Sequence, residues 1–280
     1  MTKRVFTTAA GTRYLKDPVA TCIARTAFKL STGAREFLLE YDEGFHEAVA
    51  DYQQIDPNNE TAMPSMFAGQ LCYLAFGEKR TATKEVGRYM DNILSSGHGS
   101  VLEHTNFSFL LYGIDRATTH ELVRHRVGFG VSQVSQRYVD SRGLRFVLPW
   151  EDQDAEGIEL FSAHIDSVRT KYAERTDRLM RKYPAREGES RTEHRKRIQS
   201  AARSVLSNDV EAPCVITVNA RSARHMIALR TGPHADVRIR RPFIQILKLL
   251  QIIAPALFTD FTYETLPDGS VSARTPYPKP

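Results

Sequence analysis

Three cationic or titratable side chains and a serine–arginine pair lie close together in the sequence and could hold phosphate groups. Arg124, His125 and Arg126 are consecutive, and Ser135 and Arg137 follow a loop of eight residues. A guanidinium group stays protonated at any biological pH and presents a planar fork of donors, so these arginines can hold polyanions without acting as bases. Ser135 and backbone N–H groups can add further donors beside Arg137. The two clusters, Arg124–Arg126 and Ser135 with Arg137, therefore suit two phosphate-bearing ligands.

Two further polar segments flank this cluster and make the pattern much more specific. They read HGSVLEH from His98 and NARSARHMIALR from Asn219. Three segments in a fixed order and spacing are far harder to obtain by chance than one short motif. Together, from about His98 to Phe258, they closely resemble the flavin-dependent thymidylate synthases, a family that methylates dUMP without a catalytic cysteine.

The resemblance implies that FAD is the cofactor and that it is bound without a Rossmann motif, since no GxGxxG follows a strand. It implies that NADPH supplies electrons and methylenetetrahydrofolate the one-carbon group. Members of the family are homotetramers with shared active sites at subunit junctions. The positions that match the family's FAD-binding residues are His98, Ser100, Arg124, His125, Arg126, Asn219, Arg221 and His225.

The same resemblance implies a nucleotide site. Ser135, Arg137 and Arg203 match residues that hold the dUMP phosphate, and Arg230 matches the arginine at the uracil ring. We expect Arg230 to be the catalytic residue, because a fixed guanidinium can stabilise negative charge that develops on the pyrimidine. The full set of predicted substrate-binding residues is Glu121, Gln133, Ser135, Arg137, Arg203 and Arg230.

Methylation of C5 of a uracil requires electron density at C5, a nearby one-carbon donor and a hydride. In such an enzyme the cofactor carries out the difficult chemical step, and the protein positions the reactants and provides electrostatic stabilisation. We therefore expect anion-binding residues in place of a nucleophile–base pair. Cys22, Cys72 and Cys214 are scattered and have no Cys-x-x-Cys spacing, which favours free buried thiols over a disulfide, a zinc site or a nucleophile. No metal site is predicted.

Composition describes an ordinary globular enzyme. The chain has 280 residues, of which 41% are hydrophobic and 25% charged, which is enough for one large core. No signal peptide or membrane segment is predicted, so we expect a cytoplasmic protein. The net charge of +5 suits anionic ligands but would also suit nucleic acid. A non-enzymatic basic nucleic-acid-binding protein therefore remains an alternative, although no nucleic-acid module is visible.

The elements that position the cluster can be predicted from periodicity and caps. Residues 105–114 are rich in aromatic residues and predict a strand, after which Asp115 caps a helix that delivers Arg124–Arg126 at its C-terminal end. The glycines at 128 and 130 predict a loop, and residues 137–148 an extended segment.

The second half of the chain predicts long helices around buried strands. Apolar residues recur at three- and four-residue intervals across 152–183, which predicts a long amphipathic helix. The charge-dense segment 186–197 is expected to be a solvated connection. The other predicted elements are helices over 192–206 and 220–230, a strand over 213–219 and a last helix that Pro242 begins or kinks.

These elements predict an α+β fold: a single domain, 1–280, in which long helices pack on a central, mainly antiparallel sheet, assembled as a homotetramer. Residues 36–90 are expected to be a largely helical insertion relative to short family members, and 267–280 a loose tail. Two departures from the family pattern are Glu121 in place of glutamine and an eight-residue loop in place of seven. They leave open a diverged member that acts on a related pyrimidine nucleotide or transfers a different one-carbon group, or one that has lost turnover.

Overall fold

A computed structural model describes residues 4–53, 57, 59–76 and 85–279 of the chain. The chain forms two compact units that are interleaved in sequence. Unit 1 comprises residues 1–19, 111–124 and 131–215, and unit 2 comprises residues 20–110, 125–130 and 216–280. The sequence analysis did not predict this division, because the chain passes from one unit to the other several times and no linker marks a boundary.

A four-stranded sheet has the order β3-β4-β7-β5. Its strands are β3 (Val19–Arg25), β4 (Asn106–Tyr112), β7 (Cys214–Asn219) and β5 (Phe129–Gln133). Every second residue of β4 is buried, as a strand with one face on a core requires. The strands predicted at 105–114 and 213–219 are confirmed. The loop predicted from the glycines at 128 and 130 is wrong in part, because β5 begins at Phe129.

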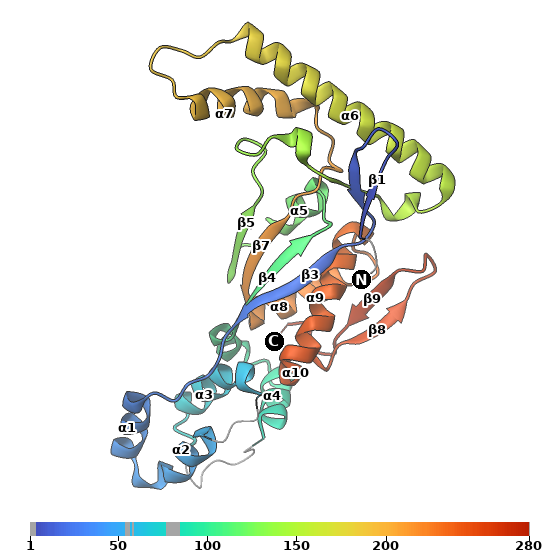
Figure 1. Cartoon of the computed structure of the whole chain (residues 1–280). Helices are drawn as coiled ribbons and strands as arrows, with labels where there is room; N and C mark the ends of the chain where they lie inside the picture. The colour runs from blue at the N-terminus through green and yellow to red at the C-terminus, as the bar shows by residue number, and fades with distance from the viewer. Residues whose placement is uncertain (1–3, 54–56, 58, 77–84, 280) are drawn as a thin grey trace. The chain divides into compact units, whose positions relative to one another are not determined.

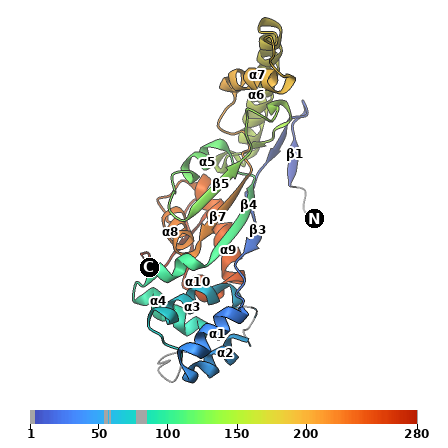
Figure 2. The same ribbon diagram turned by 90° about the vertical axis from the view of Figure 1, so that its left-hand side faces the viewer.

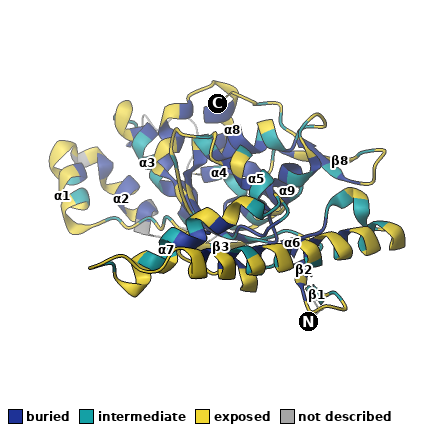
Figure 3. Cartoon of the chain, turned by 90° about the horizontal axis from the view of Figure 1, so that it is seen from above, coloured by how far each residue is buried: buried dark blue, intermediate teal, exposed yellow. Residues whose placement is uncertain are grey.

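Unit 1 contains a second sheet, in which β1 (Val5–Thr7) pairs antiparallel with β2 (Arg13–Leu15), and β2 pairs parallel with β6 (Phe146–Val147). Helix α6 (Ala155–Lys182) buries Phe161, Ile165 and Val168 in the same core as Tyr14 and Phe146. These buried positions are the ones that the periodicity indicated, so the long helix is confirmed. Its outer face is exposed (Figure 3).

Helix α7 (Arg191–Ala202) lies alongside α6 and continues into the short helix η6 (Arg203–Val205) (Figure 1). Ile198 and Ala202 pack on Tyr172 and Leu179 of α6. Ser190 and Glu193 form a capping box at the start of α7. The solvated connection predicted at 186–197 therefore extends only as far as Ser190, after which the chain is helical.

The helix predicted after Asp115 is α5 (Arg116–Leu122), and its cap is present: Asp115 Oδ1 accepts a hydrogen bond of 2.7 Å from the N–H of Thr118. The helix ends at Leu122, however. Arg124–Arg126 lie in the following turn and not on the last helical turn, which corrects the prediction. Residues 137–148 are also not a continuous strand, because the short helix η4 (Ser141–Gly143) interrupts them before β6.

Unit 2 contains a group of helices built from the N-terminal third of the chain (Figure 2). The helices are α1 (Thr32–Tyr41), η1 (Glu43–Phe45), α2 (His46–Gln53), η2 (Glu60–Ala62), α3 (Met63–Cys72), α4 (Val86–Ser95) and η3 (Gly99–His104). The described parts of 36–90 are thus helical. Residues 54–56, 58 and 77–84 of the predicted insertion lie outside the described residues.

The C-terminal part of unit 2 contains α8 (Ala220–Arg230), α9 (Val237–Ile253) and α10 (Pro255–Phe258). The predicted helix 220–230 is confirmed, whereas α9 begins five residues before Pro242, which lies inside it. Strands β8 (Thr262–Thr265) and β9 (Val271–Arg274) then pair antiparallel. The prediction of a loose tail after residue 266 is therefore wrong for β9, whose Ala273 is buried and donates its N–H to Thr231 O.

The prediction of a mixed helix and sheet architecture with antiparallel strand pairing is confirmed. The short helix η5 (Trp150–Asp152), which precedes α6, completes the elements named here. No helix in the described ranges is long and apolar enough to cross a membrane.

Candidate active site

The centre of the candidate site in unit 2 is a contact between two predicted site residues. The Nε–H of Arg230, in the last turn of α8, donates a hydrogen bond of 3.1 Å to Nε2 of His125. The His125 ring also meets the rings of His225 and Phe129 nearly edge-on, with centroids 6.4 and 6.5 Å away. Residues about 100 positions apart in the sequence are thus brought into direct contact.

The surroundings of His125 keep its imidazole neutral. Partial burial lowers the pKa of His125, and the electrostatic effects of Arg230 and His225 lower it further, to about 4. A neutral imidazole has one nitrogen that accepts a hydrogen bond, and this is what the Arg230 donor requires. His125 therefore orients the Arg230 guanidinium without adding positive charge to the site.

The turn that follows Arg126 is fixed to the start of α8. Ser222 Oγ donates to Val127 O at 2.7 Å, and the N–H of Asn219 donates to Gly128 O at 3.1 Å. Gly128 has a φ of +59°, and a Cβ there would lie 2.2 Å from Asn219 Nδ2. Only glycine fits this position, both for its backbone conformation and for its lack of a side chain.

The segment that contains His98 and Ser100 also adjoins α8. Glu103, in η3, forms an ion pair of 2.7 Å with Arg221, and the N–H of Ala220 donates to Thr105 O at 2.8 Å. His98 and Ser100 are exposed at the start of η3. Three predicted cofactor segments thus meet in one unit. Glu103 is thus the ion-pair partner of a predicted cofactor residue, Arg221.

Two of the three arginines of α8, Arg221 and Arg224, have different surroundings. Arg224 is 1% exposed and makes two hydrogen bonds of 2.7 Å to the Asp260 carboxylate, with Thr275 beside the same carboxylate. Arg221 has a half-exposed side chain. Arg224 is therefore a structural residue, whereas Arg221 can still reach a ligand.

Unit 1 contains most of the residues predicted for the nucleotide. The Nε–H of Arg137 donates to Ser200 Oγ at 3.2 Å, and its backbone N–H donates to Ser135 Oγ at 3.3 Å. Arg203 caps the C-terminal end of α7, three residues after Ser200, so the two side chains are neighbours on the helical surface. The amide of Gln133 donates to Thr119 Oγ1 on α5 at 3.1 Å.

The predicted set therefore divides between the units. Unit 2 contains His98, Ser100, His125, Arg126, Asn219, Arg221, His225 and Arg230. Unit 1 contains Glu121, Arg124, Gln133, Ser135, Arg137 and Arg203. Sequence reasoning missed two residues that adjoin these groups. Ser200 is three residues before the predicted binding residue Arg203, and Ser222 is three residues after the predicted binding residue Asn219. This spacing is the one signal that could have indicated them.

Two of the three cysteines, Cys22 and Cys214, are poor nucleophiles. Cys214 is 2% exposed, and burial raises the pKa of its thiol to about 12. Burial also raises the pKa of Cys22. Since the thiolate is the reactive form, neither thiol is activated. Cys72 is exposed, which corrects the expectation that all three thiols are buried. Among the described residues no three His, Cys, Asp or Glu side chains gather so as to hold a metal ion.

Comparison with known proteins gives a match over most of the chain. The family model described as thymidylate synthase complementing protein matches residues 53–256, a span that includes every predicted site residue. A flavin-dependent thymidylate synthase of Mycobacterium avium (strain 104) is 43% identical over 211 residues, which are 75% of this chain and 83% of the relative. One from Mycobacterium sp. (strain KMS) is 44% identical over 214 residues, 75% of this chain and 84% of the relative.

A solved structure has a similar fold. The crystal structure of the UMP/dUMP methylase PolB from Streptomyces cacaoi, bound with 5-Br dUMP, matches with a TM-score of 0.59 and 17% identity, covering 88% of this chain and 95% of that one. At this identity the likeness concerns the fold alone. The sequence matches are to enzymes, which argues against the alternative of a non-enzymatic nucleic-acid-binding protein.

Proposed function

This chain belongs to the family of thymidylate synthase complementing proteins, whose similar members are named flavin-dependent thymidylate synthases. From that premise we propose that it is an enzyme that converts dUMP to dTMP by reductive methylation of C5. Methylenetetrahydrofolate donates the one-carbon group, NADPH supplies the electrons, and no cysteine acts as a nucleophile. The observation that carries the proposal is the match over residues 53–256, within which the whole predicted site lies.

The cofactor is a flavin, and we infer FAD. When bound, the flavin provides the hydride that reduces the transferred methylene group. The residues that hold it are Arg124, His125 and Arg126, with His98, Ser100, Asn219, Arg221 and His225. Two features support this choice: the tight turn at Gly128 brings backbone close to the start of α8, and cationic side chains around it stay exposed to a ligand. Arginine donors suit the two phosphates of FAD.

Two groups of residues are proposed to bind the nucleotide, and each lies in one unit. Ser135, Arg137 and Arg203 bind the 5′-phosphate, and Arg230 contacts the uracil ring, where its positive charge stabilises negative charge on the pyrimidine. Arg230 cannot serve as a base, since its guanidinium does not lose a proton in proteins. The hydrogen bond to His125 supports this role, because it restricts the guanidinium to one orientation before substrate binds.

Glu121 and Gln133 are the remaining residues of the proposed nucleotide site. The bond from Gln133 to Thr119 brings its amide to α5, the helix that carries Glu121. We infer that Gln133 supplies an amide near the nucleotide, as glutamine does at the position of Glu121 in most of the family. The exchange Glu121→Gln tests whether the carboxylate lowers turnover: an increased rate indicates that it does.

The enzyme is proposed to be a cytoplasmic homotetramer that shares its active sites between subunits. The proposal rests on the family resemblance. Light scattering of the purified chain measures the oligomeric state directly.

The first test is the visible spectrum of the protein after FAD is added and excess removed, repeated during a titration with dUMP. A retained flavin band that shifts with dUMP supports binding of both ligands at one site, and dTMP formed with NADPH and methylenetetrahydrofolate then establishes the reaction. A band that responds to UMP and not to dUMP indicates a related pyrimidine nucleotide. A folded protein that retains no flavin refutes the proposal.

A further inference from the structure

Arg116, the first residue of α5, is a half-buried arginine whose charged neighbour is another arginine. Its backbone N–H donates to Asn208 O at 2.9 Å and to Val210 O at 3.2 Å, which joins α5 to the segment just after η6. Burial lowers the pKa of Arg116, and the positive charge of Arg203 in η6 lowers it further. The sequence analysis did not single out Arg116, because no family motif includes it.

Two other arginines of unit 1 have carboxylate partners. Arg145 pairs with Glu211 at 2.5 Å, and Arg197 pairs with Glu189 at 2.8 Å. In the described part of the chain, Arg116 has no such ion pair. The positive charges of Arg116 and Arg203 repel each other, and an anionic ligand would remove that repulsion.

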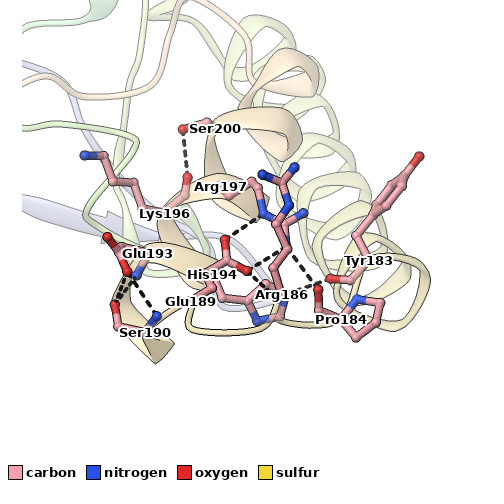
Figure 4. Close-up of polar contacts among 10 residues, drawn as sticks. All are labelled: Tyr183, Pro184, Arg186, Glu189, Ser190, Glu193, His194, Lys196, Arg197 and Ser200. Atoms are coloured by element: carbon pink, nitrogen blue, oxygen red, sulfur yellow. Dashed lines mark hydrogen bonds and ion pairs between the residues drawn. The ribbon is translucent and has the colours of Figure 1, made fainter.

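Other polar groups converge on the same end of α7. Arg137 and Ser200 are hydrogen-bonded there, one helical turn before Arg203. Lys196 lies one turn further back, with its Nζ 4.6 Å from the centroid of the Tyr138 ring. Ser200 Oγ also donates to Lys196 O at 2.7 Å, which fixes the hydroxyl that Arg137 uses (Figure 4).

Asp209, which lies between Asn208 and Val210, pairs with His164 at 3.0 Å, and two further carboxylates, Glu189 and Glu193, are engaged at the opposite end of α7. Glu189 holds Arg197, and Glu193 accepts hydrogen bonds from the N–H and hydroxyl of Ser190 (Figure 4). The interval from Glu193 to Arg203 is about 15 Å along a helix at 1.5 Å per residue. The positive charge around Arg203 is thus left for a ligand.

We propose that Arg116 is a further substrate-binding residue, which joins Arg137 and Arg203 on the 5′-phosphate of the nucleotide. This inference rests on the proposed function, within which it adds one charge to the phosphate site. A phosphate monoester carries close to two negative charges at neutral pH, and bidentate arginine contacts match its oxygens. The phosphate is remote from C5, so Arg116 contributes to binding and not to the chemical step.

The test compares Arg116→Gln and Arg116→Lys with Arg178→Gln, which removes the same charge from an exposed position of α6. We expect Arg116→Gln to weaken dUMP binding about tenfold or more, to raise KM for dUMP by a similar factor and to leave kcat within about twofold. Arg116→Lys should recover part of the affinity. Arg178→Gln should bind dUMP as the wild type does.

The Tm of the ligand-free protein should change in the direction opposite to the affinity for dUMP. Because Arg116 and Arg203 repel each other without ligand, Arg116→Gln should have the same Tm as the wild type or a higher one, while its Tm increase with dUMP or inorganic phosphate is smaller. A residue needed only for folding would lower the ligand-free Tm.

Wild-type affinity for dUMP in Arg116→Gln overturns the inference and leaves the proposed function intact. If the wild type fails to bind dUMP, the proposed function is refuted. The role of Arg116 is then tested by the Tm increase with inorganic phosphate. A Tm increase with phosphate that Arg116→Gln loses supports the anion site, and no such increase in the wild type refutes it.

Discussion

Replacement of Gly128 by alanine should disturb the turn between Arg126 and β5, and the structure gives the size of the effect. Gly128 has a φ of +59°, where an L-residue costs roughly 1–2 kcal/mol. The new Cβ would also lie 2.2 Å from Asn219 Nδ2 and 2.6 Å from Ser222 Oγ. Asn219 must then move, although its Oδ1 caps α8 by accepting from the N–H of Ser222 at 2.8 Å.

Loss of a cap costs about 0.5–2 kcal/mol, so Gly128→Ala should lower the free energy of unfolding by about 1.5–4 kcal/mol. If the turn keeps its shape only when flavin is bound, part of this cost appears in binding. One to two kcal/mol corresponds to a loss of flavin affinity of about 5- to 30-fold. Urea unfolding measures the stability, and quenching of flavin fluorescence measures the affinity.

Gly130→Ala is the matched control. Gly130 lies two residues away in β5, its φ is not positive, and a Cβ there meets no atom within 4 Å. Both substitutions restrict the unfolded chain equally, so the difference between them isolates the native turn. If Gly128→Ala has the stability and flavin affinity of Gly130→Ala, the argument that the turn requires glycine is refuted.

Three other substitutions have expected outcomes. Arg224→Met should lower the free energy of unfolding by about 3–5 kcal/mol, because it leaves the Asp260 carboxylate without its partner. Arg221→Met should change the free energy of unfolding by less than about 1 kcal/mol. Equal urea midpoints for the two variants would contradict the assignment of Arg224 as structural. Cys214→Ser should keep methylation activity and bound flavin, since the pKa of the Cys214 thiol is about 12 and the thiol forms almost no thiolate at pH 8. A folded, flavin-bearing variant without methylation activity would show that the thiol takes part in the reaction. His125 has a folded pKa of about 4, below its usual 6.5, so the unfolded chain takes up a proton first as pH falls. Stability of the wild type should therefore decrease from pH 6.5 towards pH 4 more steeply than that of His125→Gln, and parallel curves from urea unfolding would show that folding does not lower the pKa of His125.

Local patterns in the sequence were sufficient for many of the elements. Apolar spacing in 152–183 predicted α6, and Asp115 predicted the start of α5, because a periodic apolar stripe and a cap act within a few residues. The predicted end of α5 was wrong, since a helix C-terminus without glycine has no equally strong local signal. Arg124–Arg126 consequently lie in a turn beyond the helix.

The strands that sequence reasoning missed depend on partners distant in the chain. Strand β5 contains Gly130 and follows Gly128, which locally indicate a loop, but β5 pairs beside β7 in the sheet. Strand β9 lies in a segment that ends in prolines, yet it pairs with β8 and buries Ala273. Cross-strand pairing and burial override weak local preference for a strand.

By itself the sequence determined which side chains this protein has for anions and in what order, since residue types and spacings are local facts that a family pattern preserves. It could not decide which of them touch. The contact of His125 with Arg230, the ion pair of Glu103 with Arg221 and the neighbouring charges of Arg116 and Arg203 each join segments far apart in the chain. Such contacts exist only after the chain has folded, because packing and burial set the distances and the pKa values on which they depend.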